Sequence, residues 1–138
     1  MSSFCKRCSE ELGDPVLIVV LALAALLWSI GFAAPFVFPH DANGAIYSLA
    51  ARNHVRFGPV ETRGANCVSV AAEHAAGNDR FYLNHPGTLS LLTAVSFAVL
   101  GEREDSARVV PALFSLATIV LLYRATRRRW NRGVARTA

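Results

Sequence analysis

The chain has 138 residues, of which 53% are hydrophobic and 17% charged, and it carries a net charge of +4. This composition is not that of an ordinary soluble domain, although the length suits a single domain. The positive charge could suggest a nucleic-acid partner. Aromatic residues do not alternate with the arginines as they do in single-strand binders, so we expect no nucleic-acid binding.

The N-terminal segment, residues 1–13, is predicted to be a cytoplasmic tail. It contains a C-x-x-C pair, Cys5 and Cys8, which resembles half of a zinc ribbon. Because the other half is missing, the pair is interpreted as reduced thiols without a metal, and Cys67 as a small loop side chain. The sequence predicts no metal site and no cofactor, and it leaves open whether a divalent cation takes part.

Residues 15–38 form an apolar run without a charged residue. A helix that crosses the hydrocarbon core of a bilayer needs about 20 such residues, so the run predicts a transmembrane helix. A cleaved signal peptide is the rival interpretation because Lys6 and Arg7 precede the run. The run is long for a signal peptide, however, and Pro39-His40 is a poor cleavage site.

A water-exposed loop is predicted over residues 39–105. Its first part, about 43–57, has apolar residues spaced as on one face of a helix and ends at Gly58-Pro59, so it predicts a short interfacial helix. The middle of the loop is small and polar and predicts one turn of helix near residues 71–76. Two aromatic residues, Phe81 and Tyr82, return the chain to the membrane edge.

The last two apolar runs cover residues 87–101 and 109–123. Each is about 22 Å long as a helix, which is short for a core of about 30 Å. The first carries Ser90, Thr93 and Ser96 at intervals of three, a polar stripe that suits a helix lying in the membrane interface. The second can be extended to about 106–125 by arginines that reach the headgroups, and a basic tail, 126–138, follows it.

These elements predict an all-α integral membrane protein with two transmembrane helices and external juxtamembrane amphipathic helices. Three spanning helices are the alternative, because the excess of arginine on one side of the membrane is larger if all three apolar runs cross it.

Polar residues at the membrane edge are the candidates for chemistry. Asp41 follows the first run closely, and its carboxylate can accept a proton from a hydroxyl group or simply cap the next helix, as Asn43 could. His85 could bind a phosphate oxygen or a sugar hydroxyl, or serve only as a polar anchor. The loop arginines, Arg52 among them, could pair with phosphate.

Three segments in order, HDANGAIYSLAARNHVRFG, FYLNHPGTLSLLTAVSFAVLG and EREDSARVVPALFSLATIVLLYRATRRRW, are similar to the start of polytopic glycosyltransferases that use lipid-linked sugars. This GT-C group includes protein O-mannosyltransferases and aminoarabinose transferases. The resemblance implies two spans, an outward-facing loop, an interfacial segment over 87–101 and cytoplasmic termini, in what we expect to be a bacterial inner membrane.

The resemblance also implies roles for particular residues. Asp41 occupies the place of the catalytic base, and Ala42 stands where many members have a second acidic residue, so no metal-binding acidic pair is expected. The His-Pro-Pro motif of the family is reduced to His85-Pro86-Gly87. His85, with Asn84 and Arg52, is expected to bind the sugar or phosphate of a polyprenyl-phosphate donor.

Members of this group are several times longer, so we expect the chain to be the N-terminal part of a longer or split enzyme and to be inactive alone. Its expected partners are membrane lipid, the lipid-linked donor and the rest of that enzyme. The alternative is a small non-enzymatic membrane scaffold or subunit, in which Asp41 caps a helix and the arginine tail binds anionic lipid.

Overall fold

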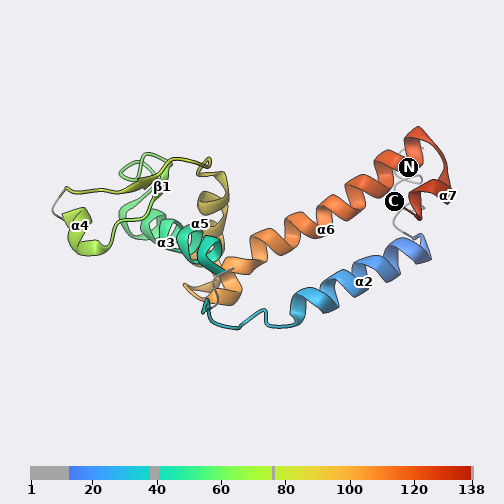
Figure 1. The fold of residues 1–138 in the computed structure, drawn as a ribbon, viewed down its shortest axis with the longest axis horizontal. Coiled ribbons are helices and arrows are strands. Elements are labelled where there is room, and N and C mark those ends of the chain that lie inside the picture. Colours follow the sequence, from blue (N-terminus) through green and yellow to red (C-terminus); the bar gives the residue numbers. More distant parts are fainter. Residues whose placement is uncertain (1–12, 38–40, 76, 138) are drawn as a thin grey trace. The chain divides into compact units, whose positions relative to one another are not determined.

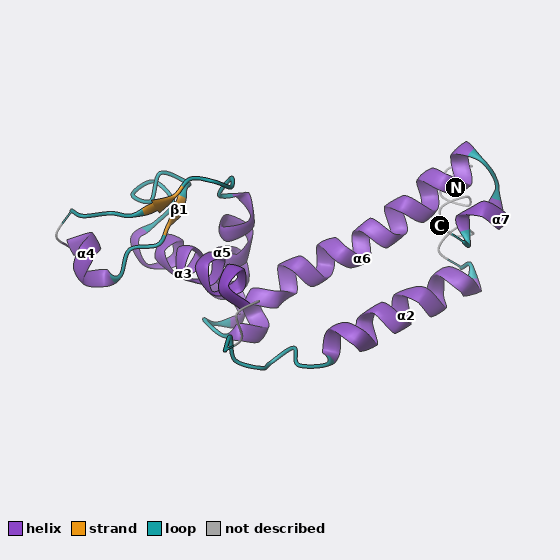
Figure 2. Cartoon of the chain, in the orientation of Figure 1, coloured by secondary structure: helices purple, strands orange, loops and turns teal. Residues whose placement is uncertain are grey.

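The computed structural model describes residues 13–37, 41–75 and 77–137. The chain is mostly helical, as expected, with two very short strands (Figures 1 and 2). It divides into two compact units, unit 1 with residues 1–31 and 112–138, and unit 2 with residues 32–111. The Cys5–Cys8 pair and nearly all of the predicted tail lie outside the described residues.

The first helix, α2, covers Pro15–Ser29. Asp14 caps it, since the Asp14 side chain accepts a hydrogen bond from the Val16 amide at 3.1 Å, and Pro15 suits the first turn. The helix ends where Gly31 adopts a left-handed conformation with φ of 70°. The prediction of one helix over 15–38 was therefore wrong in its C-terminal third, and α2 is about 22 Å long for its 15 residues.

The longest helix, α6, covers Glu104–Arg129 and exceeds the predicted span of about 106–125 at both ends. Glu104 and Asp105 lie in its first turn, and arginines in its last, where each sign of charge is favourable to the helix dipole. Among the described residues, α6 is the one helix long and apolar enough to cross a membrane, while α2 and α5 are shorter apolar helices. The predicted basic tail, 126–138, contains a further short helix, α7 (Arg132–Ala135).

In unit 1, α2 contacts the C-terminal half of α6. A small core forms from Leu17, Tyr123 and Ala135, with Leu21 and Ile119 packed against it. Pairing of early α2 residues with late α6 residues makes the two helices antiparallel. Most of their other large apolar side chains are exposed: Ile18, Val19, Val20, Leu23, Leu26, Leu27, Leu113, Phe114, Leu121 and Leu122.

In unit 2, the helices α3 (Ala42–Phe57) and α5 (Thr88–Leu100) pack against each other, close to the predicted bounds of 43–57 and 87–101. Small side chains allow this close approach. The core consists of Ala51, Ala94, Phe97 and Ala107, and the half-buried Phe36 packs on it.

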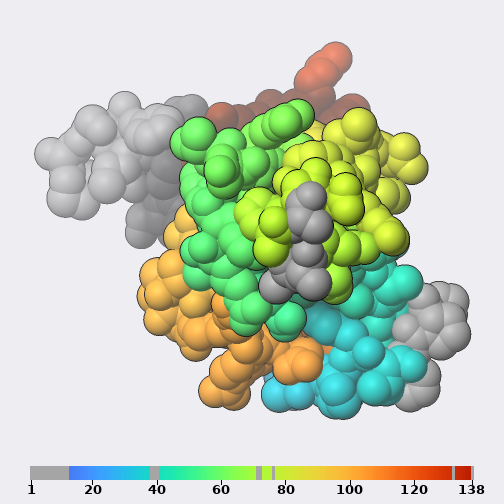
Figure 3. Space-filling view, turned by 90° about the vertical axis from the view of Figure 1, so that its left-hand side faces the viewer, coloured from blue at the N-terminus to red at the C-terminus, as the bar shows by residue number. Residues whose placement is uncertain are grey.

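The loop after α3 is more ordered than predicted. The helical turn expected near 71–76 is confirmed as α4 (Ala71–Ala75), but the loop also forms two strands, β1 (Asn66–Cys67) and β2 (Phe81–Tyr82), which pair antiparallel. Figure 3 shows this loop, in green to yellow, gathered over one face of unit 2. Two-residue strands leave no periodicity that a sequence pattern could reveal.

The two faces of α5 differ in polarity and in burial. Its polar stripe is buried and its other face is apolar and exposed, with Val99 at 76% exposure. Two of its hydroxyl groups find acceptors inside unit 2: Ser90 Oγ donates to Asn66 Oδ1 at 2.6 Å and Ser96 Oγ to the Ser106 carbonyl at 2.7 Å. Interior carbonyl and amide groups, which the sequence does not locate, bind these hydroxyl groups.

Candidate functional site

Asp41 lies at the start of α3, in the N-cap position, and is half-buried. Its side chain makes no capping hydrogen bond to the helix, and Asn43 lies within the first turn. The capping role that rivalled a chemical role for Asp41 is therefore not carried out by either side chain.

The Asn84-His85 turn follows β2, and both residues are exposed. The buried Asn66 side chain holds this turn, because its Nδ2 donates to the His85 carbonyl oxygen at 3.0 Å. The His85 ring lies 5.5 Å from the ring of Tyr82 and 6.3 Å from that of Tyr47, measured between centroids. Since Tyr47 belongs to α3, the turn meets the helix that Asp41 begins.

Gly87, which stands where the resembled family has a second proline, has no room for a side chain. A Cβ atom on Gly87 would lie 2.1 Å from the carbonyl oxygen of Gly64. The loop backbone therefore occupies the space that a proline ring would need. Pro86 precedes α5 rather than entering its first turn, because Gly87 is the N-cap residue.

Arg52 lies on α3, eleven residues after Asp41, which is about 16 Å along a helix. Its Nε forms an ion pair with Glu102 at 3.2 Å, and Arg56 pairs with the same carboxylate at 3.1 Å. The structure thus brings His85 to the Asp41 half of α3 and places Arg52 toward the other end, paired with Glu102.

An apolar hollow with a volume of about 230 Å³ lies beside the first turns of α3. Tyr47, which also faces His85, lines it together with residues from α5 and α6. The full lining is Phe36, Asn43, Gly44, Tyr47, Ser48, Leu89, Thr93, Ala107, Arg108 and Pro111. The hollow can hold an apolar group close to the polar residues of the turn and the helix start.

A buried polar network supports this arrangement from inside unit 2. His54 is 4% exposed; its Nδ1 lies 2.6 Å from Thr62 Oγ1 and its Nε2 3.2 Å from Ser90 Oγ. Ser90 Oγ donates to Asn66 Oδ1 at 2.6 Å. Burial lowers the pKa of His54 below its ordinary value, because the interior disfavours the charged ring.

A second set of contacts fixes the loop to α3. Asn53 Nδ2 donates to the carbonyl oxygens of Cys67 and Ser69 at 2.8 and 2.9 Å. The thiol of Cys67 is buried, as expected of a small side chain. Asp79 Oδ1 lies 2.8 Å from His74 Nδ1, and this hydrogen bond lowers the pKa of Asp79.

In the part of the chain that the structure describes, no three metal-ligating side chains cluster in a way that could hold a metal ion. Comparison with known proteins found no match: no family model, no curated protein and no solved structure is detectably similar to the chain. The geometry of the site is therefore what supports a function.

Arg108, which lines the hollow, is the main residue of the site that the sequence pattern did not reveal. It was expected to reach lipid headgroups, but its Nη1 donates to the carbonyl oxygen of Phe32 at 2.8 Å and also to that of Ala34. An arginine at the start of a predicted span fits either role, so the sequence alone could not distinguish them.

Proposed function

We propose that the chain is the N-terminal part of an integral-membrane glycosyltransferase, which transfers a sugar from a polyprenyl-phosphate donor to an acceptor hydroxyl at the outer membrane face. The observation that carries this proposal is the meeting of two distant motifs. His85 of the Asn-His-Pro turn lies 6.3 Å from Tyr47, on the helix that Asp41 begins.

In the proposed reaction Asp41 is the general base. Its carboxylate takes the proton of the acceptor hydroxyl while the hydroxyl oxygen attacks the anomeric carbon. The bond from that carbon to the phosphate oxygen breaks on the opposite side, so the configuration inverts and polyprenyl phosphate leaves. His85 and Asn84 would bind the phosphate or the sugar, and the hollow beside Tyr47 is apolar enough for the first isoprene unit.

Arg52 has a weaker claim to substrate binding than His85. It already pairs with Glu102, a carboxylate that it shares with Arg56. For Arg52 to bind a phosphate, the anion would have to displace this carboxylate or join it. We therefore propose for Arg52 a contact with a distant part of the donor or acceptor rather than with the reacting atoms.

The surface of unit 1 supports a membrane location. Many large apolar residues of α2 and α6 are exposed around a small core, and soluble proteins rarely expose so many together. On α5 the exposed face is also apolar while the hydroxyl groups point inward. This polarity favours contact with acyl chains along that face.

The contact between the two ends of unit 1 favours two spans over three. Tyr123 Oη donates to Asp14 Oδ2 at 2.7 Å, so the start of α2 and the end of α6 lie together. An even number of crossings between them brings both to the same side of a bilayer, whereas three crossings would separate them by about 30 Å. We propose that this side is the cytoplasm, because it carries the arginines of the tail.

Donor binding can be tested on the full chain in lipid nanodiscs. A polyprenyl-phosphate sugar with a diazirine on its first isoprene unit should crosslink to peptides that contain Tyr47 or His85. Unlabelled donor should compete, and His85→Ala should reduce the crosslinking. If plain polyprenol reduces the crosslinking as strongly as the unlabelled donor does, donor binding is contradicted. That result would favour the alternative, a non-enzymatic membrane scaffold.

The role of Asp41 needs a separate experiment, in membranes that also contain the rest of the enzyme. Asp41→Asn should abolish sugar transfer to the acceptor while the diazirine donor still crosslinks. Undiminished transfer by this variant would rule out the base role.

A further inference from the structure

We infer that Arg108 is a positioning residue, which together with Phe36 and Gly44 fixes the chain on both sides of Asp41. These three residues are called the Arg108 clamp below. The inference rests on the proposed function only for its catalytic consequence, since the contacts themselves can be tested without donor or acceptor.

The first part of the clamp holds the segment that leads to Asp41. Arg108 Nη1 donates to the carbonyl oxygens of Phe32 and Ala34, which lie in an irregular stretch of the chain. The guanidinium carbon of Arg108 also lies 4.4 Å from the centroid of the Phe36 ring, at cation–π distance. One side chain of α6 thus binds this segment at three points.

The second part holds the segment that follows Asp41. Gly44 lies in the first turn of α3, and a Cβ atom on it would come within 2.6 Å of the Phe36 ring. The absence of a side chain at Gly44 therefore lets the ring pack directly on the helix backbone. Phe36 also packs against the core of unit 2, so the ring is not free to move aside.

The consequence is that Asp41 lies between two fixed points of the chain: Phe36 is held by Arg108, and Gly44 packs on Phe36. Contacts that fix the chain on both sides of a residue restrict the positions that the residue can occupy. A carboxylate that acts as a base must lie within hydrogen-bond reach of the proton it takes. The clamp limits the positions that Asp41 can occupy before any substrate binds.

A guanidinium group suits this role better than an ammonium group. It is planar, so it can lie over an aromatic ring while its fixed N–H groups reach two carbonyl oxygens. A lysine at position 108 would keep the charge but could not maintain all three contacts. Arg108→Lys is therefore a graded variant between the wild type and Arg108→Gln.

Hydrogen exchange of the full chain in nanodiscs tests the clamp locally. Arg108→Gln should raise exchange about tenfold in peptides covering residues 32–37 and 44–50, with no change over 88–100. Arg108→Lys should have a smaller effect on the same peptides, and Phe36→Leu should reproduce the pattern with Arg108 intact. The matched control is Arg56→Gln, which removes an arginine of unit 2 that pairs with Glu102 and should change neither peptide.

Two results would overturn the inference: unchanged exchange over 32–37 and 44–50 in Arg108→Gln, or an equal rise over 88–100. If Arg108→Gln does not accumulate, Arg108→Lys and Phe36→Leu give the same test. Where transfer is measurable, Arg108→Gln should lower kcat by a larger factor than it changes the KM for the donor, because Arg108 positions Asp41 and is only one of ten residues that line the hollow. Failure of donor crosslinking would refute the proposed function and leave the exchange result standing, so the two failures are distinguishable.

Discussion

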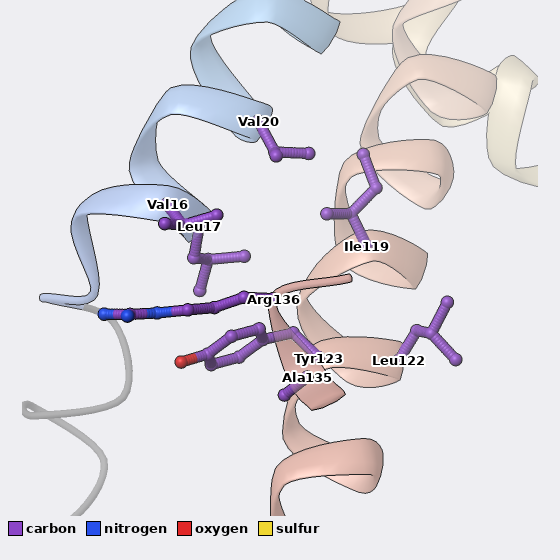
Figure 4. A pocket seen from close by; sticks show the side chains of 8 residues that line it. All are labelled: Val16, Leu17, Val20, Ile119, Leu122, Tyr123, Ala135 and Arg136. Atoms are coloured by element: carbon purple, nitrogen blue, oxygen red, sulfur yellow. The ribbon is translucent and has the colours of Figure 1, made fainter. Parts of the chain in front are cut away.

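Unit 1 and unit 2 use buried polar groups in different ways. Unit 1 has one charged cluster at the end of its helix pair, where Asp14 meets Tyr123 and Arg136, and an apolar hollow of about 140 Å³ beside it (Figure 4). Unit 2 instead buries neutral amide and hydroxyl groups throughout its interior. The difference indicates that a buried charge contributes to the stability of unit 1 beside its small apolar core, whereas many neutral hydrogen bonds contribute in unit 2.

The strongest test of this contrast removes the charge of unit 1. Asp14→Ala deletes a fully buried carboxylate that accepts hydrogen bonds from Tyr123 and the Val16 amide and pairs with Arg136 at 3.2 Å. We expect the free energy of unfolding to fall by about 3 kcal/mol, as when one partner of a buried ion pair is lost. Equilibrium unfolding in mixed micelles measures this.

Glu61→Gln is the control for that experiment, because Glu61 is an exposed acid of unit 2. It should stay close to the wild type. An Asp14→Ala protein as stable as Glu61→Gln would mean that the charged cluster contributes nothing and that the contrast between the units is wrong.

The next largest effect is expected at Gly87 in unit 2. Gly87→Ala places a methyl group against the Gly64 carbonyl oxygen, and a backbone atom cannot rotate out of the way as a side chain can. We expect a loss of about 2 kcal/mol in unfolding free energy, typical of overpacking. Gly133→Ala is the comparison, because its Cβ would meet a side-chain oxygen at 3.2 Å; equal losses for both would refute the steric account.

Removal of one amide should have a smaller and more local effect. Asn53→Ala leaves the Cys67 and Ser69 carbonyl oxygens without their donor, at a cost of about 1.5 kcal/mol. Because Cys67 is buried, its thiol reports on this loop. In a background with Cys5 and Cys8 changed to serine, maleimide should label Cys67 faster in Asn53→Ala; an unchanged labelling rate would show that Asn53 does not hold the strand.

The smallest expected effect is a pH dependence in unit 2. Burial lowers the pKa of folded His54 below 6.5, so the unfolded chain takes up a proton first as the pH falls. The contribution of the neutral ring to the free energy of unfolding is fully present above pH 6.5. It is lost as the pH falls through the pKa of His54 in the folded state. The free energy of unfolding should change less between pH 7.5 and pH 5.5 in His54→Gln than in the wild type. An equal change in the two proteins would contradict this.

The sequence predicted the helices of the chain better than their orientation. Apolar spacing and the Gly58-Pro59 break located α3 and α5, because helix bounds depend on local residues. The sequence revealed the polar stripe of α5 but not that this stripe is buried. The partners of Ser90 and Ser96 are Asn66 and the Ser106 carbonyl, and no local pattern identifies such contacts.

The candidate site was predicted in part. The order of the motifs pointed to Asp41 and His85, and the structure brings the His85 turn to the helix that Asp41 begins. The order of the motifs did not point to Phe36 or Gly44, whose contact depends on the close approach of an irregular segment to a helix. The pairing of Arg52 with Glu102 was also missed, since the two residues are fifty positions apart.

Our central proposal is that unit 1 crosses the membrane with both ends in the cytoplasm and that unit 2 lies outside. Single cysteines at Leu83, Leu26 and Thr137, in a chain without native cysteines, test it with an impermeant maleimide on intact and permeabilised bacterial cells. Leu83→Cys, at a site 76% exposed in unit 2, should label in intact cells. Thr137→Cys should label only after permeabilisation, and Leu26→Cys in neither case. Labelling of Thr137→Cys in intact cells, or protection of Leu83→Cys there, would contradict the account.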